Sequence, residues 1–279
     1  MTTLGIIAGG GELPLAIAES VRDAGRDVFV LGLSGADDGL SQFPRENAGI
    51  GELGKSLSLL KKHGCEDVTF AGRVSRPDWS ALKVDTRGAL ALPKIIAAAL
   101  KGDDALMRAM LGIFEKEGFR VIGSAEAAPD LIATPGIYGR HKPDAQAQAD
   151  IARARDVVRR MGELDIGQAA AVADGLVLAV EAAEGTDVML ERLTDLPRNL
   201  RGTPQKRRGV LVKAPKPAQE RRVDLPVIGV RTIELASASG LAGVAVEAGA
   251  ALLMRKAKIV EAADRLGLFV MAFEPAVTA

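Results

Sequence analysis

The stretch that decides the fold is LGIIAGGGELPLAIAESVRDAGRDVFVLGL, which runs from Leu4 to Leu33. Its first residues, Leu4 to Ala8, are mostly apolar and are followed by three glycines, which is typical of a buried strand that ends in a tight turn. Pro14 then opens a segment with helical spacing of apolar residues, and Val28 to Leu33 has the character of a second buried strand. A strand, a glycine turn, a helix and another strand, in this order, predict a parallel α/β sheet.

The same alternation continues through the first half of the chain. Further helices are expected at 54–63, 93–99 and 104–116, and further strands at 68–71 and 119–122. Strands that alternate with helices build an open sheet covered by helices. We therefore expect a Rossmann-like N-terminal domain over residues 1–130.

Residues 131–145 differ in character from what precedes them. They are rich in proline and glycine, which favours a linker between domains. Beyond them the expected helices are 147–161, 188–193, 232–239 and 259–266, and the expected strands are 174–182, 209–212, 227–230, 243–249 and 268–273. This order predicts a C-terminal α/β catalytic domain over residues 146–279.

Composition excludes several classes of protein. The 279 residues carry 36 Lys and Arg against 36 Asp and Glu, so there is no basic excess to hold nucleic acid, and aromatic residues make up only 3%. A single cysteine rules out an intramolecular disulfide framework and fits a reducing compartment. With two histidines and one cysteine, a structural zinc site is not expected. No signal peptide or stretch of about 18 apolar residues is present, so we expect a cytoplasmic protein.

The segment VKAPKPAQERRVDLPVIG, from Val212 to Gly229, is the clearest candidate for a functional site. It gathers four cations, including Lys213 and Lys216, around two carboxylates, one of which is Asp224. Its three prolines stiffen the backbone. Cationic side chains bind phosphate oxygens, and a nearby aspartate can hold a divalent metal or take a proton from water. A solvated surface loop is the alternative, because most charged runs face water.

Two further loops follow predicted strands of the first half. Gly9, Gly10 and Gly11 lie between a strand and a helix, where backbone N–H groups can face a phosphate, although the spacing departs from the dinucleotide fingerprint GxGxxG. The loop AGRVSRP carries Arg73 and Ser75 beyond the next strand, on the side where α/β sheets bind ligands. A tight turn and ordinary loop charges remain the alternatives.

Two segments of the second half carry polar groups near glycines. Gln168 follows a glycine in LDIGQAAAV, and AVEAAEGTD places Glu181, Glu184, Thr186 and Asp187 after a predicted strand. Carboxylates grouped in this way suit a hard cation such as Mg²⁺. The alternative is a loop in which Thr186 or Asp187 caps the following helix.

Seven segments together resemble one family, the LpxI-type UDP-2,3-diacylglucosamine pyrophosphatases. In chain order they are IAGGGELP, GRVSRPD, KGDDALMR, LDIGQA, VEAAEGTD, VKAPKPAQERRVDLPVIG and GLAGVAVEAG. The resemblance covers nearly the whole chain, and the lysine- and proline-rich segment is its most specific part.

The resemblance implies a cytoplasmic enzyme of lipid A biosynthesis in a Gram-negative bacterium. It would hydrolyse UDP-2,3-diacylglucosamine to UMP and 2,3-diacylglucosamine 1-phosphate (lipid X), with Mg²⁺ or a similar divalent cation. In this family the substrate lies between the two domains. The family also implies a homodimer, and contact with the inner membrane at its periphery is compatible with a lipid substrate.

The resemblance implies one essential site residue, Asp224, and the other site residues are assigned from the chemistry of the motifs quoted above. The aspartate of the VDLP segment, Asp224, is the essential acid, acting on a metal or on the attacking water, and Lys213 is assigned to phosphate. The expected substrate contacts are Gly10, Gly11, Arg73, Ser75, Gln168, Thr186 and Lys216. Asp187 joins Asp224 as an expected metal ligand.

Two other classes of function remain as alternatives. The glycine-rich first turn is also found in nicotinamide-dependent oxidoreductases, although the broken fingerprint argues against that class. A nucleotide-sugar or lipid-binding protein without turnover is the second alternative.

Overall fold

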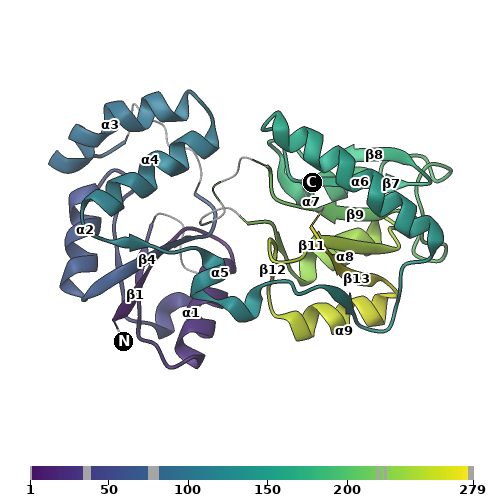
Figure 1. The fold of residues 1–279 in the computed structure, drawn as a ribbon, viewed down its shortest axis with the longest axis horizontal. Helices are drawn as coiled ribbons and strands as arrows, with labels where there is room; N and C mark the ends of the chain where they lie inside the picture. Colours follow the sequence, from purple (N-terminus) through teal and green to yellow (C-terminus); the bar gives the residue numbers. More distant parts are fainter. Residues whose placement is uncertain are drawn as a thin grey trace. The chain divides into compact units, whose positions relative to one another are not determined.

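The computed structural model describes residues 2–33, 39–74, 82–217, 220, 222 and 225–275, the side chain of Asp103 excepted. The chain divides into two compact units, which are both α/β (Figure 1). The N-terminal unit comprises Met1–Asp130 and the short segment Glu220–Val223. The C-terminal unit comprises Leu131–Gln219 and Asp224–Ala279. The expected fold class, a Rossmann-like α/β domain followed by a second α/β domain, is confirmed.

The N-terminal unit is built on a parallel sheet with the strand order β3-β2-β1-β4-β5. Its strands are β1 (Thr3–Ala8), β2 (Val28–Gly32), β3 (Arg45–Asn47), β4 (Cys65–Ala71) and β5 (Arg120–Val121). Its helices are α1 (Leu13–Asp23), α2 (Leu53–Lys62), α3 (Thr86–Ala99), α4 (Asp103–Lys116) and α5 (Ser124–Ala127), with 3₁₀ turns η1 (Leu40–Gln42) and η2 (Pro129–Leu131). The central strands β1 and β2 are buried along nearly their whole length, as the apolar runs in the sequence predict.

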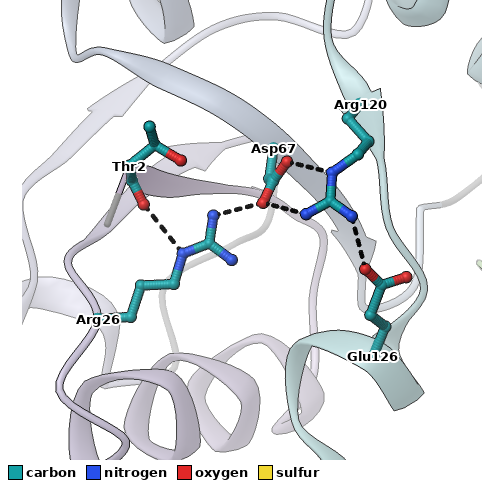
Figure 2. A network of polar contacts seen from close by, with 5 residues as sticks. All are labelled: Thr2, Arg26, Asp67, Arg120 and Glu126. Carbon is teal, nitrogen blue, oxygen red and sulfur yellow. Dashed lines mark hydrogen bonds and ion pairs between the residues drawn. The ribbon is translucent and has the colours of Figure 1, made fainter.

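A network of ion pairs fixes the amino ends of these strands (Figure 2). Asp67, near the start of β4, receives two hydrogen bonds of 2.7 Å from Arg120 and one of 2.6 Å from Arg26. Arg26 also donates to the carbonyl of Thr2, and Arg120 to Glu126. The side chain of Asp67 is only 8% exposed, so its charge depends on these partners. The network therefore stabilises the sheet at the amino ends of its strands, away from their carboxyl ends.

The C-terminal unit contains a mixed sheet with the strand order β6-β13-β11-β9-β7-β8 and a separate pair, β10-β12. The strands of the sheet are β6 (Gly136–Tyr138), β7 (Ala169–Ala173), β8 (Leu176–Val180), β9 (Val210–Lys213), β11 (Gly243–Glu247) and β13 (Phe269–Phe273). The pair consists of β10 (Val227–Ile228) and β12 (Leu252–Leu253). Strands β9, β11 and β13 are parallel, and β6 and β7 run antiparallel to their neighbours.

Helices cover both faces of this sheet. Helix α6 (Ala145–Glu163) packs on one face through Ile151, Ala154 and Val158. Helices α7 (Gly185–Leu193), α8 (Val230–Ala238) and α9 (Lys256–Leu266) supply the core on the other face. Alternate residues of β7, β9, β11 and β13 enter the two cores, as the period of a strand requires. Leu211 of β9 belongs to one core, and its neighbours Val210 and Val212 belong to the other.

The strand expected at 174–182 begins in a turn. Asp174 and Gly175 have φ angles of 51° and 78°, which a strand does not allow, and they connect β7 to β8. The buried carboxylate of Asp150 on α6 accepts hydrogen bonds from both backbone N–H groups, at 3.0 and 2.8 Å. The sequence prediction therefore missed β7, which is the first strand of the hairpin that β7 and β8 form.

The segment expected as a linker, 131–145, contains β6, which pairs with β13. Tyr138 of β6 donates a hydrogen bond of 2.6 Å to the carbonyl of Thr134, and both residues belong to the C-terminal unit.

Among the described helices, none has the length and apolar character needed to cross a lipid bilayer.

Candidate functional site

The N-terminal unit brings two predicted loops together at the carboxyl ends of its strands. The chain passes outward from β1 through β2 to β3, and then returns to place β4 on the other side of β1. The strand order therefore reverses between β1 and β4, which is where open α/β sheets bind ligands. Gly10 follows β1 and Arg73 follows β4. Their backbones exchange two hydrogen bonds of 2.8 Å, Gly10 N–H to Arg73 O and Arg73 N–H to Gly10 O.

Glycine is required where these two loops meet. A Cβ atom on Gly9 would lie 2.5 Å from the carbonyl oxygen of Arg73, and one on Gly72 would lie 2.7 Å from that of Gly10. Gly72 also has a φ of 89°, which other residues rarely adopt. The glycines of the two motifs therefore serve the contact between the loops.

Gly11 differs from these glycines. Its φ is 97°, and a Cβ atom there would meet no atom within 4 Å. It lies just before α1, whose first turn contains Pro14. The structure thus groups Gly10, Gly11 and Arg73 beside the start of a helix, while Ser75 lies outside the described residues.

A second cluster of polar residues lies at the ends of the neighbouring strands β9, β7 and β8 in the C-terminal unit. Lys213 is the last residue of β9 and pairs with Ala169, the first residue of β7. Gln168 precedes β7, and Glu181 follows β8 directly. Backbone hydrogen bonds join these positions, from Glu181 N–H to Ala169 O at 2.9 Å and from Ala214 N–H to Gln168 O at 3.1 Å. The sheet therefore brings three segments that are distant in the sequence to one place.

The side chains form a directed chain of hydrogen bonds. Lys213 Nζ donates to Thr186 Oγ1 at 2.8 Å and to the Val227 carbonyl at 3.1 Å. The Thr186 hydroxyl in turn donates to Glu181 Oε1 at 2.7 Å. The other carboxylate oxygen of Glu181 accepts from the backbone N–H of Gln168 at 3.2 Å. An ammonium, a hydroxyl and a carboxylate are thus linked in one line.

Each member of this line is buried. The exposed fractions are 5% for Lys213, 9% for Thr186 and 7% for Glu181. A buried charge is costly unless it is paired and hydrogen-bonded, and the hydroxyl between the two charges satisfies both. Such a group holds a cation in a fixed place at the edge of the sheet, which is what recognition of a phosphate requires.

The glycine of LDIGQ is explained by the same group. A Cβ atom on Gly167 would lie 2.1 Å from the carbonyl oxygen of Glu181. Any other residue would push the segment before β7 away from Glu181, and the bond from Gln168 N–H would be lost.

Two of the expected site residues are engaged elsewhere in the C-terminal unit. Lys216 donates to Asp165 at 2.6 Å, in the loop after α6. Asp187 Oδ2 accepts from Arg231 of α8 at 2.8 Å, and no hydrogen bond to its Oδ1 is found among the described residues. The structure thus brings together Gln168, Thr186 and Lys213, and it pairs Lys216 and Asp187 with other partners.

The charged segment after β9 enters the N-terminal unit for four residues, Glu220–Val223. Arg222 donates to both carboxylate oxygens of Glu220 at 2.9 Å and to Glu115 of α4 at 2.7 Å. The backbone N–H of Glu220 donates to Asp104 at 2.9 Å. The guanidinium lowers the pKa of Glu220, because it stabilises the ionised carboxylate. Residues Glu220 and Arg222 are therefore anchored just before Asp224, which lies outside the described residues.

Metal ligands are limited in the part of the chain that the structure describes. No group of three or more His, Cys, Asp or Glu side chains there could hold an ion. Magnesium needs fewer protein ligands, since it keeps waters and is often bound by one or two carboxylates together with substrate phosphates. Asp187, with one oxygen outside its ion pair, fits such a role.

Sequence reasoning missed the positions of Glu181 and Arg222 in this arrangement. Glu181 was visible only as one of several carboxylates near a glycine, and its bond to Thr186 depends on where β8 ends. Arg222 was one cation among four, and its partner Glu115 lies 107 positions earlier in the chain.

Comparison with known families gives two matches that together cover most of the chain. Residues 3–131 match the LpxI N-terminal domain, and residues 134–271 match the LpxI C-terminal domain. The chain is 52% identical over 276 residues to the UDP-2,3-diacylglucosamine pyrophosphatase LpxI of Caulobacter vibrioides, with 99% of each chain covered.

Solved structures resemble the chain much less. CobK precorrin-6A reductase has 16% identity and a TM-score of 0.30, with 100% of this chain and 90% of that chain covered. The N5-carboxyaminoimidazole ribonucleotide synthetase from Thermotoga maritima has 13% identity and a TM-score of 0.26, with 99% and 70% covered. Neither similarity bears on the function.

Proposed function

The chain belongs to the LpxI family of UDP-2,3-diacylglucosamine pyrophosphatases, and from this premise we propose that it hydrolyses the pyrophosphate bond of UDP-2,3-diacylglucosamine to UMP and 2,3-diacylglucosamine 1-phosphate. Family membership makes it an enzyme, a hydrolase acting on a phosphoric anhydride. The products and the need for a divalent cation such as Mg²⁺ are part of the proposal.

The observation that supports this proposal is the buried line from Lys213 through Thr186 to Glu181. A pyrophosphate carries negative charge that must be neutralised before water can attack phosphorus. Glu181 accepts from Thr186, so the lone pairs of the hydroxyl oxygen face Lys213 and hold its ammonium in one orientation. Lys213 then presents a fixed positive charge to phosphate oxygens, without reorganisation during the reaction.

Asp224 is proposed as the acid that holds the metal or orients the attacking water. A bound Mg²⁺ would supply Lewis-acid stabilisation of the phosphate oxygens. Asp224 and Asp187 are the residues proposed to hold it, together with substrate oxygens. The ion pair between Asp187 and Arg231 leaves Asp187 Oδ1 for this purpose.

The remaining substrate contacts are proposed for the loops around the two groups. Gln168 and Lys216 would bind the substrate in the C-terminal unit. Gly10, Gly11, Arg73 and Ser75 would bind it through the loops of the N-terminal unit, where the start of α1 favours an anionic group. A homodimer is a further proposal, which sedimentation velocity tests.

Product analysis tests the reaction. The protein is incubated with UDP-2,3-diacylglucosamine and Mg²⁺ in ¹⁸O-labelled water, and we expect UMP and the sugar 1-phosphate in equal amounts, with one of them labelled. The label identifies the phosphorus that is attacked. Loss of both products with EDTA and recovery with Mg²⁺ would support the metal. Tight binding without turnover across several divalent cations would refute the proposed reaction and favour a binding protein.

Two variants sharpen this test. Lys213→Met keeps much of the volume of the side chain and removes its charge, and we expect a large fall in kcat. Lys206→Met, at an exposed lysine of the same unit, is the matched control and should leave kcat unchanged. Equal activity of the two variants would contradict the role proposed for Lys213.

A further inference from the structure

Helix α3 carries the two most exposed large apolar side chains of the described residues. Leu90 is 80% exposed and Leu100, the residue that caps the helix, is 84% exposed. Only Gly88 of the helix is buried. Helix α3 packs mainly against α4 and α2, and Figure 1 shows it beside α4. One side of an apolar helix therefore has no partner in the described part of the chain.

Most of the exposed residues of α3, with the two residues that follow the helix, form two parallel rows. Residues three, four or seven apart lie on one side of a helix. The first row is apolar and consists of Leu90, Pro93, Ala97 and Leu100. The second row consists of Arg87, Lys94 and Lys101, and lies beside the first. We call these two rows together the α3 outer face; all of their residues are exposed.

The charge of this face has one sign. Residues 86–102 contain no aspartate or glutamate. Arg87 pairs with Glu117 at 2.7 Å, whereas neither Lys94 nor Lys101 makes an ion pair within the described residues. An apolar row flanked by lysines is the arrangement by which surface helices lie on anionic lipid, because the apolar side chains enter the interface and the cations meet the headgroups.

We propose that the α3 outer face binds the surface of an anionic lipid bilayer. The proposal concerns adsorption to the surface, and it does not depend on the reaction proposed above. Adsorption would bring the enzyme to the membrane surface, where a substrate that carries acyl chains would lie.

Other partners fit this face less well. If two copies of the chain paired through this face about a two-fold axis perpendicular to the helix, the two lysine rows would meet, and like charges would oppose the contact. With the axis parallel to the helix, the lysine row of each copy would lie against the apolar row of the other and would be desolvated without a partner. A single acyl chain would need a concave apolar site, whereas these leucines stand on the outside of a helix.

Vesicle cosedimentation, performed without substrate, tests the proposal. The wild-type protein should sediment with vesicles of phosphatidylcholine and phosphatidylglycerol, and more weakly with phosphatidylcholine alone or at high salt. Leu90→Glu/Leu100→Glu should lower binding about tenfold or more, because two apolar anchors are lost and two negative charges are added. Leu164→Glu is the matched control, since Leu164 is 73% exposed in the C-terminal unit, and it should bind as the wild type does.

The lysines are tested separately. Lys94→Glu/Lys101→Glu should lower binding to anionic vesicles, and the matched pair Lys206→Glu/Lys258→Glu, at exposed lysines of the C-terminal unit, should have a much smaller effect. Circular dichroism and thermal unfolding confirm that each variant is folded.

Three outcomes would overturn the proposal. The first is equal binding to neutral and anionic vesicles, and the second is binding that the α3 variants do not change. The third is a dimer in sedimentation velocity that Leu90→Glu/Leu100→Glu dissociates while the wild-type protein binds no vesicles, which would make the α3 outer face a subunit interface. Turnover of substrate dispersed in detergent is measured in parallel, so that failure to bind vesicles is distinguished from failure of the proposed reaction.

Discussion

Thr186 Oγ1 lies 2.8 Å from Lys213 Nζ, and this contact links the start of α7 to the end of β9. The hydroxyl accepts from the ammonium and donates to Glu181, so a single oxygen atom orders two buried charges. A residue that a helix-cap interpretation would place at the surface is in fact buried.

Replacement of Thr186 by valine keeps the shape of the side chain and removes this link. Lys213 and Glu181 each lose a buried partner, and we expect a loss of about 1–3 kcal/mol in the free energy of unfolding, together with a fall in kcat of about tenfold or more. Thr186→Ser should restore most of both. Thr194→Val, at an exposed threonine at the end of α7, is the control. Urea unfolding and steady-state kinetics measure the effects, and equal results for Thr186→Val and Thr194→Val would contradict the argument.

The anchor between Arg222 and Glu115 should affect catalysis more than stability. Glu115→Ala frees one side of the guanidinium, so the segment before Asp224 can take more positions, and we expect kcat to fall about threefold to tenfold. The pair is exposed, so the unfolding midpoint should change little. Glu117→Ala, just after α4, is the control, because Glu117 pairs with Arg87 and Lys61 instead. If both variants keep the wild-type kcat, the segment does not need this anchor.

Gly72→Ala should separate the two loops that are held together by the hydrogen bonds between Gly10 and Arg73. The new Cβ would lie 2.7 Å from the Gly10 carbonyl oxygen, in addition to the strain of a positive φ. Gly118→Ala is a matched control, because Gly118 has a φ of 92° but a Cβ atom there would meet no atom within 4 Å. We expect both to be destabilised by about 1 kcal/mol from backbone strain, and Gly72→Ala by more. KM for the nucleotide substrate should rise for Gly72→Ala alone, and a rise of equal size in both variants would refute the role of the loop contact.

Asp67 should make the stability of the N-terminal unit depend on pH. Hydrogen bonds from Arg120, and then from Arg26, hold the pKa of this carboxyl below its usual value. Because the pKa is lower in the folded state, the stabilisation is fully present above the unfolded value of about 3.9 and is lost as the pH falls through the folded value.

The variant Asp67→Asn tests this dependence. We expect it to unfold with about 2 kcal/mol less free energy than the wild type at neutral pH, and the difference should shrink as the pH falls below about 4. Asp23→Asn, at an aspartate whose side chain is 75% exposed, is the control. Urea unfolding at a series of pH values gives the result, and a difference that does not change with pH would contradict the assignment.

Cys65 should be inert while the protein is folded. The side chain is buried at the start of β4, and desolvation raises the pKa of the thiol to about 11. We expect no reaction with Ellman's reagent at pH 8 until urea unfolds the protein. Ser58→Cys, on the exposed side of α2, provides a control that should react at once with one thiol per chain. Rapid reaction of wild-type Cys65 would show that this part of the sheet opens.

Strands that are buried on both faces were predictable from the sequence. The apolar runs of β1, β2 and β13 indicate burial on both faces of a sheet. Strand β3, Arg45–Asn47, was missed because three polar residues show no apolar pattern. Strand β7 was missed because it is mostly alanine, which has little strand propensity, and its place depends on β8 and β9 beside it.

The start of helix α3 was predicted seven residues too late, because a proline was taken as the first helical residue. Pro93 suggested the start of a helix, but the helix begins at Thr86, where Asp85 caps it by accepting from Gly88 N–H at 2.7 Å. The capping residue was visible in the sequence, and the proline lies inside the helix. A helix that is exposed on one side tolerates such an interruption more readily than one enclosed in a core.

The candidate site was predictable in its residue types and only in part in its contacts. Lys213, Thr186 and Gln168 were expected from three separate motifs, and the sheet register that joins Ala169 to Lys213 brings them together. Spacing alone could not give that register, because it depends on an antiparallel pairing between segments about 40 residues apart. For the same reason the bond between Arg222 and Glu115 had no signal in the local sequence.

The short return of Glu220–Val223 to the N-terminal unit has a consequence for protein engineering. A fragment that ends at Asp130 would lack Arg222, and Glu115 would lose a partner that belongs to the same unit. The N-terminal unit is therefore encoded by two separate pieces of sequence. A chimera that exchanges this unit between relatives should carry both pieces, since a swap of residues 1–130 alone would place a foreign α4 against the native Arg222.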